Sequence, residues 1–278
     1  MATVIGESGA WREIAKPLWQ CGLNVFHPKD IEPLLIHLRA TYQPSVDQKK
    51  LEIAQCVATK ENRLADLHAE KGAWRSFLNL FRILSCKMAI SQLHREERQY
   101  IVTLTANIIR LDKLRESAEL VGARTEIDVI ASLARLPDEY TVFNGLRLRA
   151  RRHIHFNGVH LRSAQIDHLV LTPAGVFMIE TKRWSRKFVE SGKYHDPFDQ
   201  TQRATYLCYD QLRRQFGKIR VRSIIACAGQ LPIAPKHSHV KVLAVSELIG
   251  YISWFKQPEL APDRLFQVRR YLERFLTA

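Results

Sequence analysis

The fold of this chain is decided by residues 165–182, which read QIDHLVLTPAGVFMIETK. The first part of this segment is rich in β-branched and aliphatic residues, Pro173-Ala174-Gly175 has the composition of a turn, and 176–181 reads as a second strand. The pattern therefore predicts an antiparallel β-hairpin.

A turn centred between Pro173 and Ala174 pairs Asp167 with Glu180. Directly paired side chains lie about 5 Å apart on one face of the hairpin, and Lys182 shares that face because alternate residues of a strand point to the same side. Two like charges repel there, and the apolar neighbours on both strands indicate partial removal of water. A divalent cation would remove the repulsion, since Mg²⁺ prefers one or two carboxylates with waters and phosphates. The alternative is a surface hairpin whose acids are neutralised by Lys182.

The formal net charge of the 278 residues is +14, which predicts attraction to a polyanion, either nucleic acid or an anionic membrane surface. Half of this charge lies between Asn144 and Tyr194, where ten Lys and Arg stand against three Asp and Glu. The five cysteines form no C-x-x-C motif, which argues for a reducing compartment and against structural zinc. Residues 1–15 lack the apolar core of a signal peptide, and no stretch reaches the ~18 apolar residues of a membrane span. We expect a cytoplasmic protein.

Three regions are predicted along the chain. Residues 1–45 carry prolines and short apolar clusters and read as an N-terminal helical cap. Residues 46–117 show apolar residues at helical spacing with mixed charges, which predicts long helices packed as an antiparallel hairpin or coiled coil, with a break at Gly72. Residues 118–278 follow the order α-β-β-β-β-α-β-β-α-α, which predicts a mixed sheet flanked by helices.

Residues 73–90 of the helical region are unusually apolar, and all their charges are positive. One interpretation is an interfacial helix that binds a membrane or a partner. The other is a buried core helix or a homodimer surface, because apolar helical stripes usually face a core. We expect the helical region to mediate homo-oligomerisation or to recruit a protein partner.

Basic residues flank the hairpin on both sides. Strands are expected at 140–143 and 146–149, and alternation places an arginine row on one face, either simply exposed or in contact with phosphates. After the hairpin, a tryptophan stands among basic residues, which suits backbone contact with base stacking, although a single tryptophan also packs in cores. The candidate nucleic-acid-binding residues are Arg147, Arg149, Arg151, Arg183, Trp184, Arg186 and Lys187.

Four motifs resemble the nuclease-related domain (NERD) family over about residues 118–250. They are Gly122-x-x-x-Glu126 on a helix, Gln165-Ile166-Asp167-His168, the segment from Gly175 to Lys182, and Asp196-Pro197-Phe198-Asp199-Gln200. That family is similar in pattern to the PD-(D/E)xK nuclease superfamily, so the resemblance implies an α/β (α+β) fold with an αβββαβ core. The last motif departs from the pattern, because Asp196-Pro197 stands where the family often has Asn-Pro.

The resemblance implies a metal-dependent nuclease that hydrolyses phosphodiester bonds, with Mg²⁺ or Mn²⁺ as cofactor and DNA as the expected substrate. It implies that Asp167 and Glu180 ligate the metal and that the carbonyl of Thr181 is a further ligand. Lys182 would orient or help to activate the attacking water and stabilise the charge of the phosphorane. Glu126 would support the metal, directly or through water.

The resemblance leaves two choices open. Gln200 occupies the late motif, but Gln202 with Tyr206 offers the Gln-x-x-x-Tyr spacing seen in related nucleases. The alternative functions are a non-catalytic nucleic-acid-binding module on a nuclease-like fold, or a membrane-associated or partner-docked protein that acts through residues 73–90. A nuclease with a recruiting segment suits antiphage defence, plasmid maintenance and repair equally well.

Overall fold

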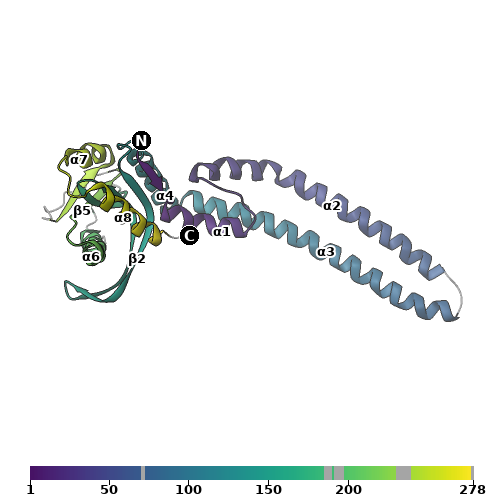
Figure 1. Ribbon diagram of the computed structural model, residues 1–278. Coiled ribbons are helices and arrows are strands. Elements are labelled where there is room, and N and C mark those ends of the chain that lie inside the picture. Colours follow the sequence, from purple (N-terminus) through teal and green to yellow (C-terminus); the bar gives the residue numbers. More distant parts are fainter. Residues whose placement is uncertain (70–72, 185–189, 191–196, 230–238, 277–278) are drawn as a thin grey trace. The chain divides into compact units, whose positions relative to one another are not determined.

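The computed structural model of the chain describes residues 1–69, 73–184, 190, 197–229 and 239–276. The chain forms two compact units. One unit consists of Met1–Gln20 together with Ser117–Ala278 and holds the β-sheet, whereas the other consists of Cys21–Glu116 and holds the long helices (Figure 1).

The sheet unit is built on a mixed sheet, as predicted. Over the described residues the sheet has six strands in the order β1-β2-β3-β4-β5-β6. The strands β2, β3 and β4 are antiparallel, whereas β1 runs parallel to β2, and β5 and β6 continue parallel to β4. Their bounds are β1 Thr3–Ile5, β2 Thr141–Phe156, β3 Val159–Thr172, β4 Gly175–Lys182, β5 Val221–Cys227 and β6 Val240–Ala244.

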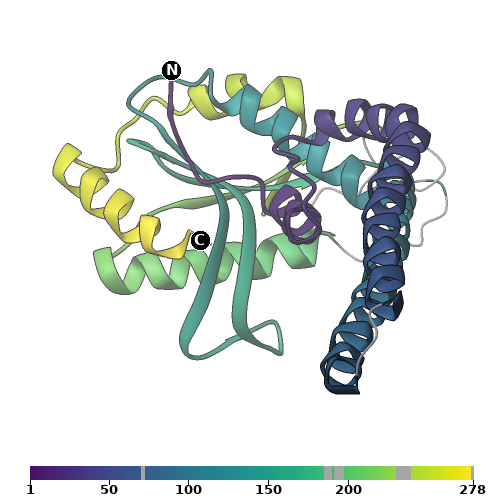
Figure 2. The same ribbon diagram turned by 90° about the vertical axis from the view of Figure 1, so that its right-hand side faces the viewer.

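Helices cover both faces of this sheet (Figure 2). On one face, residues of α4 and α7 pack with Phe177 and Ile179 of β4. On the other face, residues of α6 and α8 pack with Leu171 and Met178. Among its described residues, the unit has the helices α1 Gly9–Gln20, α4 Ala118–Leu133, α6 Pro197–Phe216, α7 Leu248–Trp254 and α8 Pro262–Leu272, with short 3-10 turns η2 Val245–Glu247 and η3 Glu273–Phe275.

The hairpin of β3 and β4 has the predicted register. Leu169 pairs with Met178 and Thr172 pairs with Gly175, so the turn is centred between Pro173 and Ala174. The Thr172 hydroxyl accepts from the Ala174 N–H at 3.1 Å and donates to the Gly175 carbonyl at 3.1 Å, which closes the turn. The apolar residues of both strands are buried on the two faces of the sheet, and the two-residue turn fixes the register of the hairpin.

The two strands predicted at 140–143 and 146–149 are one continuous strand, β2. Gly145 has a φ of +62° and lies inside it. The pairing with β3 keeps the same register on both sides of this glycine, so the strand is not interrupted. β2 turns into β3 at Asn157-Gly158, where φ is 47° and 74°. Asn-Gly is a strong signal for a two-residue hairpin, and it marks a strand end that the sequence analysis did not place.

Residues 1–20 pack in the sheet unit and do not form a cap with 21–45. β1 pairs with β2, where Thr3 lies opposite Thr141. The buried residues of α1 include Trp11, Ala15 and Leu18, which recur at helical spacing and give the helix an apolar side. The prediction of a single helical cap over residues 1–45 is therefore corrected. Packing residues 1–20 in the sheet unit buries the apolar side of α1 and pairs β1 with the edge of β2.

The second unit is an antiparallel helical hairpin, as predicted (Figure 1). A 3-10 turn, η1 Pro28–Asp30, leads into α2 Ile31–Ala69, and α3 Ala73–Arg115 returns. The predicted break at Gly72 lies outside the described residues, between these two helices. α2 begins well before residue 46 and contains Pro44, which is exposed, so the predicted boundary there is not a structural break.

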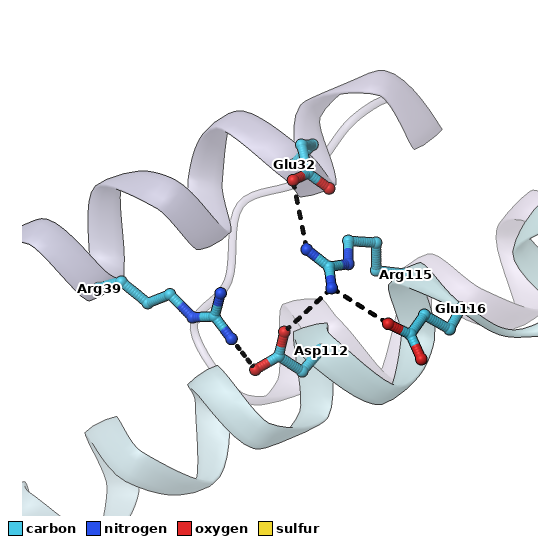
Figure 3. Close-up of polar contacts among 5 residues, drawn as sticks. All are labelled: Glu32, Arg39, Asp112, Arg115 and Glu116. Carbon is cyan, nitrogen blue, oxygen red and sulfur yellow. Dashed lines mark hydrogen bonds and ion pairs between the residues drawn. The ribbon is translucent and has the colours of Figure 1, made fainter.

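Ion pairs join the start of α2 to the end of α3 (Figure 3). Arg115 contacts Glu32 at 3.4 Å, Glu116 at 3.1 Å and Asp112 at 4.0 Å, and Arg39 also pairs with Asp112. These side chains are 30–77% exposed, so each pair contributes little free energy. As a network they favour one alignment of the two helices.

The segment of α3 near its start exposes apolar side chains. Leu80, Phe81, Leu84 and Met88 are 54–66% exposed. The interpretation of residues 73–90 as a buried core helix is therefore wrong for these four residues, and a homodimer or partner surface stays a prediction. Over the described residues, no helix is both long enough and apolar enough to cross a membrane.

Candidate active site

Glu180 lies at the centre of a polar cluster at the end of β4. It is 3% exposed, and its Oε1 accepts hydrogen bonds from Lys182 Nζ at 2.7 Å and from Gln200 Nε2 at 3.1 Å. Lys182 follows two residues later on β4, and Gln200 comes from the first turn of α6. The structure therefore brings together three of the predicted site residues from two elements.

Asp167 occupies the position on β3 that the hairpin register places opposite Glu180, one step beyond the pair His168–Ile179. Its Oδ2 accepts the Thr181 N–H at 2.8 Å. Burial raises the pKa of Asp167 well above its ordinary value, and the charges of Glu180 and Glu126 raise it further. The Thr181 N–H and Lys182 act in the opposite direction but do not cancel the effect. A negative charge on Asp167 is therefore costly in the fold.

Glu126 on α4 is the third carboxylate of the cluster and is 8% exposed. Its Oε2 accepts from the Ser8 hydroxyl at 2.7 Å and from the Ala10 N–H at 3.3 Å. Burial raises the pKa of Glu126, as does the charge of Glu180 to a smaller extent, whereas the hydrogen bonds from Ser8 and Ala10 lower it. Sequence reasoning found Glu126 but missed Ser8 and Ala10, which lie more than 110 residues away in the chain.

The donor set of this cluster fits a hard divalent cation. Asp167 and Glu180 offer two carboxylates, which suits Mg²⁺ because that ion keeps several waters and uses few protein ligands. Burial and, after it, repulsion from Glu180 and Glu126 raise the pKa of Asp167, and a bound cation would offset this cost of the ionised form. In the part of the chain that the structure describes, no three His, Cys, Asp or Glu side chains are placed together to hold one ion. Glu126 instead accepts hydrogen bonds from Ser8 and Ala10.

A buried polar chain lies beside the carboxylates. His168 Nδ1 lies 2.8 Å from Asn144 Oδ1, and His168 Nε2 lies 3.1 Å from the Thr181 hydroxyl. Burial lowers the pKa of His168 to about 3, so the ring is neutral. Asn144 Nδ2 donates to the Gly6 carbonyl at 3.3 Å, so its oxygen is the acceptor for a proton on Nδ1, and Nε2 accepts from Thr181. His168 belongs to a motif that the sequence analysis quoted, but it was given no role there.

The predicted nucleic-acid-binding arginines are exposed wherever their side chains are described. Arg147 and Arg149 lie exposed on β2, and Arg183 lies exposed after β4. Arg147 also lines a cavity of about 780 Å³ together with side chains of α1 and with Gln165 of β3. The side chain of Arg151, and all of Arg186 and Lys187, lie outside the described residues.

The structure places Trp184 in the core, contrary to the prediction that it binds nucleic acid. It is 8% exposed and packs in a hydrophobic cluster with Phe198, Ile225 and Cys227. Its ring is therefore part of the core and offers no open face on which a base could stack.

The late motif is represented in the cluster by Gln200. Gln200 donates a hydrogen bond to Glu180, whereas Gln202 and Tyr206 line a cavity of about 520 Å³ together with residues of β5 and β6. The ring of Tyr206 stacks on Phe156 with centroids 4.5 Å apart. The geometry therefore favours Gln200 over the alternative of Gln202 with Tyr206.

Comparison with known proteins tests the family resemblance found in the sequence. Residues 121–228 match the family model of the nuclease-related domain, and no curated protein matches the chain. The matched segment contains all five predicted catalytic residues and ends before β6. β1 and α1 lie outside it although they belong to the same compact unit. Residues 121–228 of this chain thus match the nuclease-related domain, and the resemblance to the NERD family is confirmed.

Proposed function

We propose that this chain is a metal-dependent nuclease that hydrolyses phosphodiester bonds in DNA. The observation that carries the proposal is the cluster of Asp167, Glu180 and Lys182, built on one buried hairpin. The nuclease-related domain supports this reading, as does the local excess of positive charge around the hairpin.

Asp167, Glu180 and the carbonyl of Thr181 are the groups that would hold Mg²⁺ or Mn²⁺. When bound, the cation supplies Lewis-acid polarisation of the scissile phosphate and favours ionisation of the attacking water. Asp167 prepares this position because its carboxylate is anchored by the Thr181 N–H. Neutral His168 contacts the Thr181 hydroxyl and holds the same stretch of β4 in place.

Lys182 supplies a fixed positive charge. Its Nζ is held at 2.7 Å from Glu180, and its side chain is 27% exposed, so a phosphate can approach it. Negative charge grows on the phosphoryl oxygens in the transition state, and a preorganised ammonium group stabilises that charge more than it stabilises the ground state. Gln200 contributes by orienting Glu180, to which it donates a hydrogen bond.

The exposed Arg147, Arg149 and Arg183 would bind the phosphate backbone. Contacts of this kind carry no sequence information but provide affinity that falls as salt rises. We also propose that the helical unit mediates homo-oligomerisation or recruits a partner, because its α3 exposes Leu80, Phe81, Leu84 and Met88.

The direct test is a cleavage assay with the full-length chain. Wild-type protein should nick or linearise supercoiled plasmid with Mg²⁺ or Mn²⁺, and EDTA should stop the reaction. Glu180→Gln should lower the rate by about 100-fold or more, because it removes charge where the cation is needed. Glu273→Gln is the matched control, since Glu273 lies in surface ion pairs with Arg269 and Arg270 and should cut like wild type.

The same assay separates the proposal from a non-catalytic binding module. Plasmid, single-stranded DNA and RNA would each be incubated with several divalent metals, and binding would be followed in parallel by fluorescence anisotropy. If wild-type protein binds these substrates in a salt-dependent way and leaves all of them intact, the nuclease proposal is wrong.

A further inference from the structure

The loop between β1 and α1 packs closely against the backbone of β2. Gly6 has a φ of +83°, and a Cβ there would lie 2.5 Å from the Asn144 carbonyl oxygen. Gly145 has a φ of +62°, and a Cβ there would lie 2.8 Å from the Glu7 carbonyl oxygen. Two glycines thus allow the loop to cross β2 at a distance that side chains would prevent. On β2, Gly145 stands between Asn144, which pairs with His168, and Leu146, which pairs with Ile166, so the register places it at the level of Asp167 on β3.

The loop between β1 and α1 places Ser8 within hydrogen-bond distance of Glu126. Ser8 is 2% exposed, and its hydroxyl donates to Glu126 Oε2 at 2.7 Å while accepting the Trp11 N–H at 3.0 Å. The Ala10 N–H contacts the same carboxylate oxygen at 3.3 Å. Both contacts come from the N-terminal end of α1, where the helix dipole favours a negative charge. They fix the orientation of a carboxylate that burial would otherwise leave costly to ionise.

We propose that Ser8 is a positioning residue of the nuclease site and that residues 1–20 complete this site by holding Glu126. The inference rests on the proposed nuclease function. It extends the site beyond the matched segment 121–228, which contains neither β1 nor α1. Ser8 is buried, so it acts through Glu126 and does not touch the substrate.

The experiment compares Ser8→Ala, Ser8→Gly and Ser8→Thr in the full-length chain. Loss of one hydrogen bond to a buried charged group should lower kcat about 10- to 100-fold for Ala and Gly, with KM for plasmid unchanged. Thr keeps the hydroxyl and should retain at least half of the wild-type kcat. In a Glu126→Gln background, Ser8→Ala should change kcat less than twofold further, because the partner charge is already gone.

A role limited to capping α1 predicts a different pattern. Glycine caps a helix nearly as well as serine, and alanine does not. Ser8→Gly at the wild-type rate, with only Ser8→Ala reduced, would therefore overturn the inference, as would equal losses in the presence and absence of the Glu126 carboxylate. Circular dichroism melting of each variant shows whether a loss of rate reflects unfolding, and Ser8→Gly and Ser8→Thr keep the test decisive if Ser8→Ala is unstable.

A second readout is the affinity for Mn²⁺, measured by calorimetry without substrate. Ser8→Ala and Glu126→Gln should weaken it by similar factors, and Ser8→Thr should not. If the wild-type protein is active and Ser8→Ala has the same Mn²⁺ affinity and the same rate, this inference is wrong and the nuclease proposal stands. Inactive wild-type protein that binds no Mn²⁺ would remove the proposed function itself.

Discussion

Asp167→Asn should lower turnover by about 1,000-fold or more and, without divalent cations, should raise the melting temperature. The loss of rate follows from losing a charged ligand of the proposed cation, whose contribution to the transition state is several kcal/mol. The gain in stability follows because burial and the nearby Glu180 and Glu126 make the ionised Asp167 costly in the fold. The asparagine oxygen can still accept the Thr181 N–H that now binds Asp167.

The stabilisation should depend on pH in a defined direction. The pKa of Asp167 is higher in the folded than in the unfolded state, so wild-type protein gains stability as pH falls through the folded pKa toward the unfolded value. The advantage of Asp167→Asn should therefore be a few degrees at pH 8 and should disappear below about pH 4. Differential scanning fluorimetry in EDTA measures it, with Asp210→Asn as the control because Asp210 pairs with Arg214 on α6 and, among the described residues, has no hydrogen bond or ion pair with the carboxylate cluster. A variant that melts below wild type at pH 8 and still cuts would contradict both expectations.

Lys182→Met should lower kcat by about 100- to 1,000-fold with little change in KM. Removing one preorganised electrostatic donor to the transition state typically has an effect of this size. Methionine fills similar space without the charge, and Lys182→Arg should restore only part of the rate, because the wider guanidinium cannot reproduce the 2.7 Å contact with Glu180. Lys218→Met, at an exposed position after α6, is the matched control.

Lys182→Met should also destabilise the metal-free protein. Glu180 has a side chain that is only 4% exposed, and removing its cationic partner leaves a buried charge held by Gln200 alone among the contacts described above. Added Mn²⁺ should recover part of the lost melting temperature. A variant with the wild-type rate would show that the ammonium group takes no part in the chemistry.

The hairpin could be predicted because its information is local. Pro173, Ala174 and Gly175 set the turn and with it the register, so counting from the turn places Asp167 and Glu180 one step beyond the pair His168–Ile179. The two strands expected at 140–143 and 146–149 form one strand, β2, and Gly145 inside it allows the close approach of the Glu7 backbone.

The parts that could not be predicted depend on contacts between distant segments. Ser8 meets Glu126 across 118 residues, and no local pattern links them. Trp184 looks like an exposed stacking residue next to Arg183, but Phe198 and Ile225 cover it from α6 and β5. The choice between Gln200 and Gln202 depends on where α6 begins, at Pro197, relative to the end of β4.

The central claim is that the carboxylates of Asp167 and Glu180 share a divalent cation. Crystals of the full-length protein soaked in MnCl₂, measured for anomalous scattering, test it most directly. We predict a manganese peak within bonding distance of one oxygen from each carboxylate, and no peak there in crystals of Asp167→Asn. Clear density for the hairpin in this register without a peak between the two side chains, or with manganese bound only elsewhere, would contradict the account.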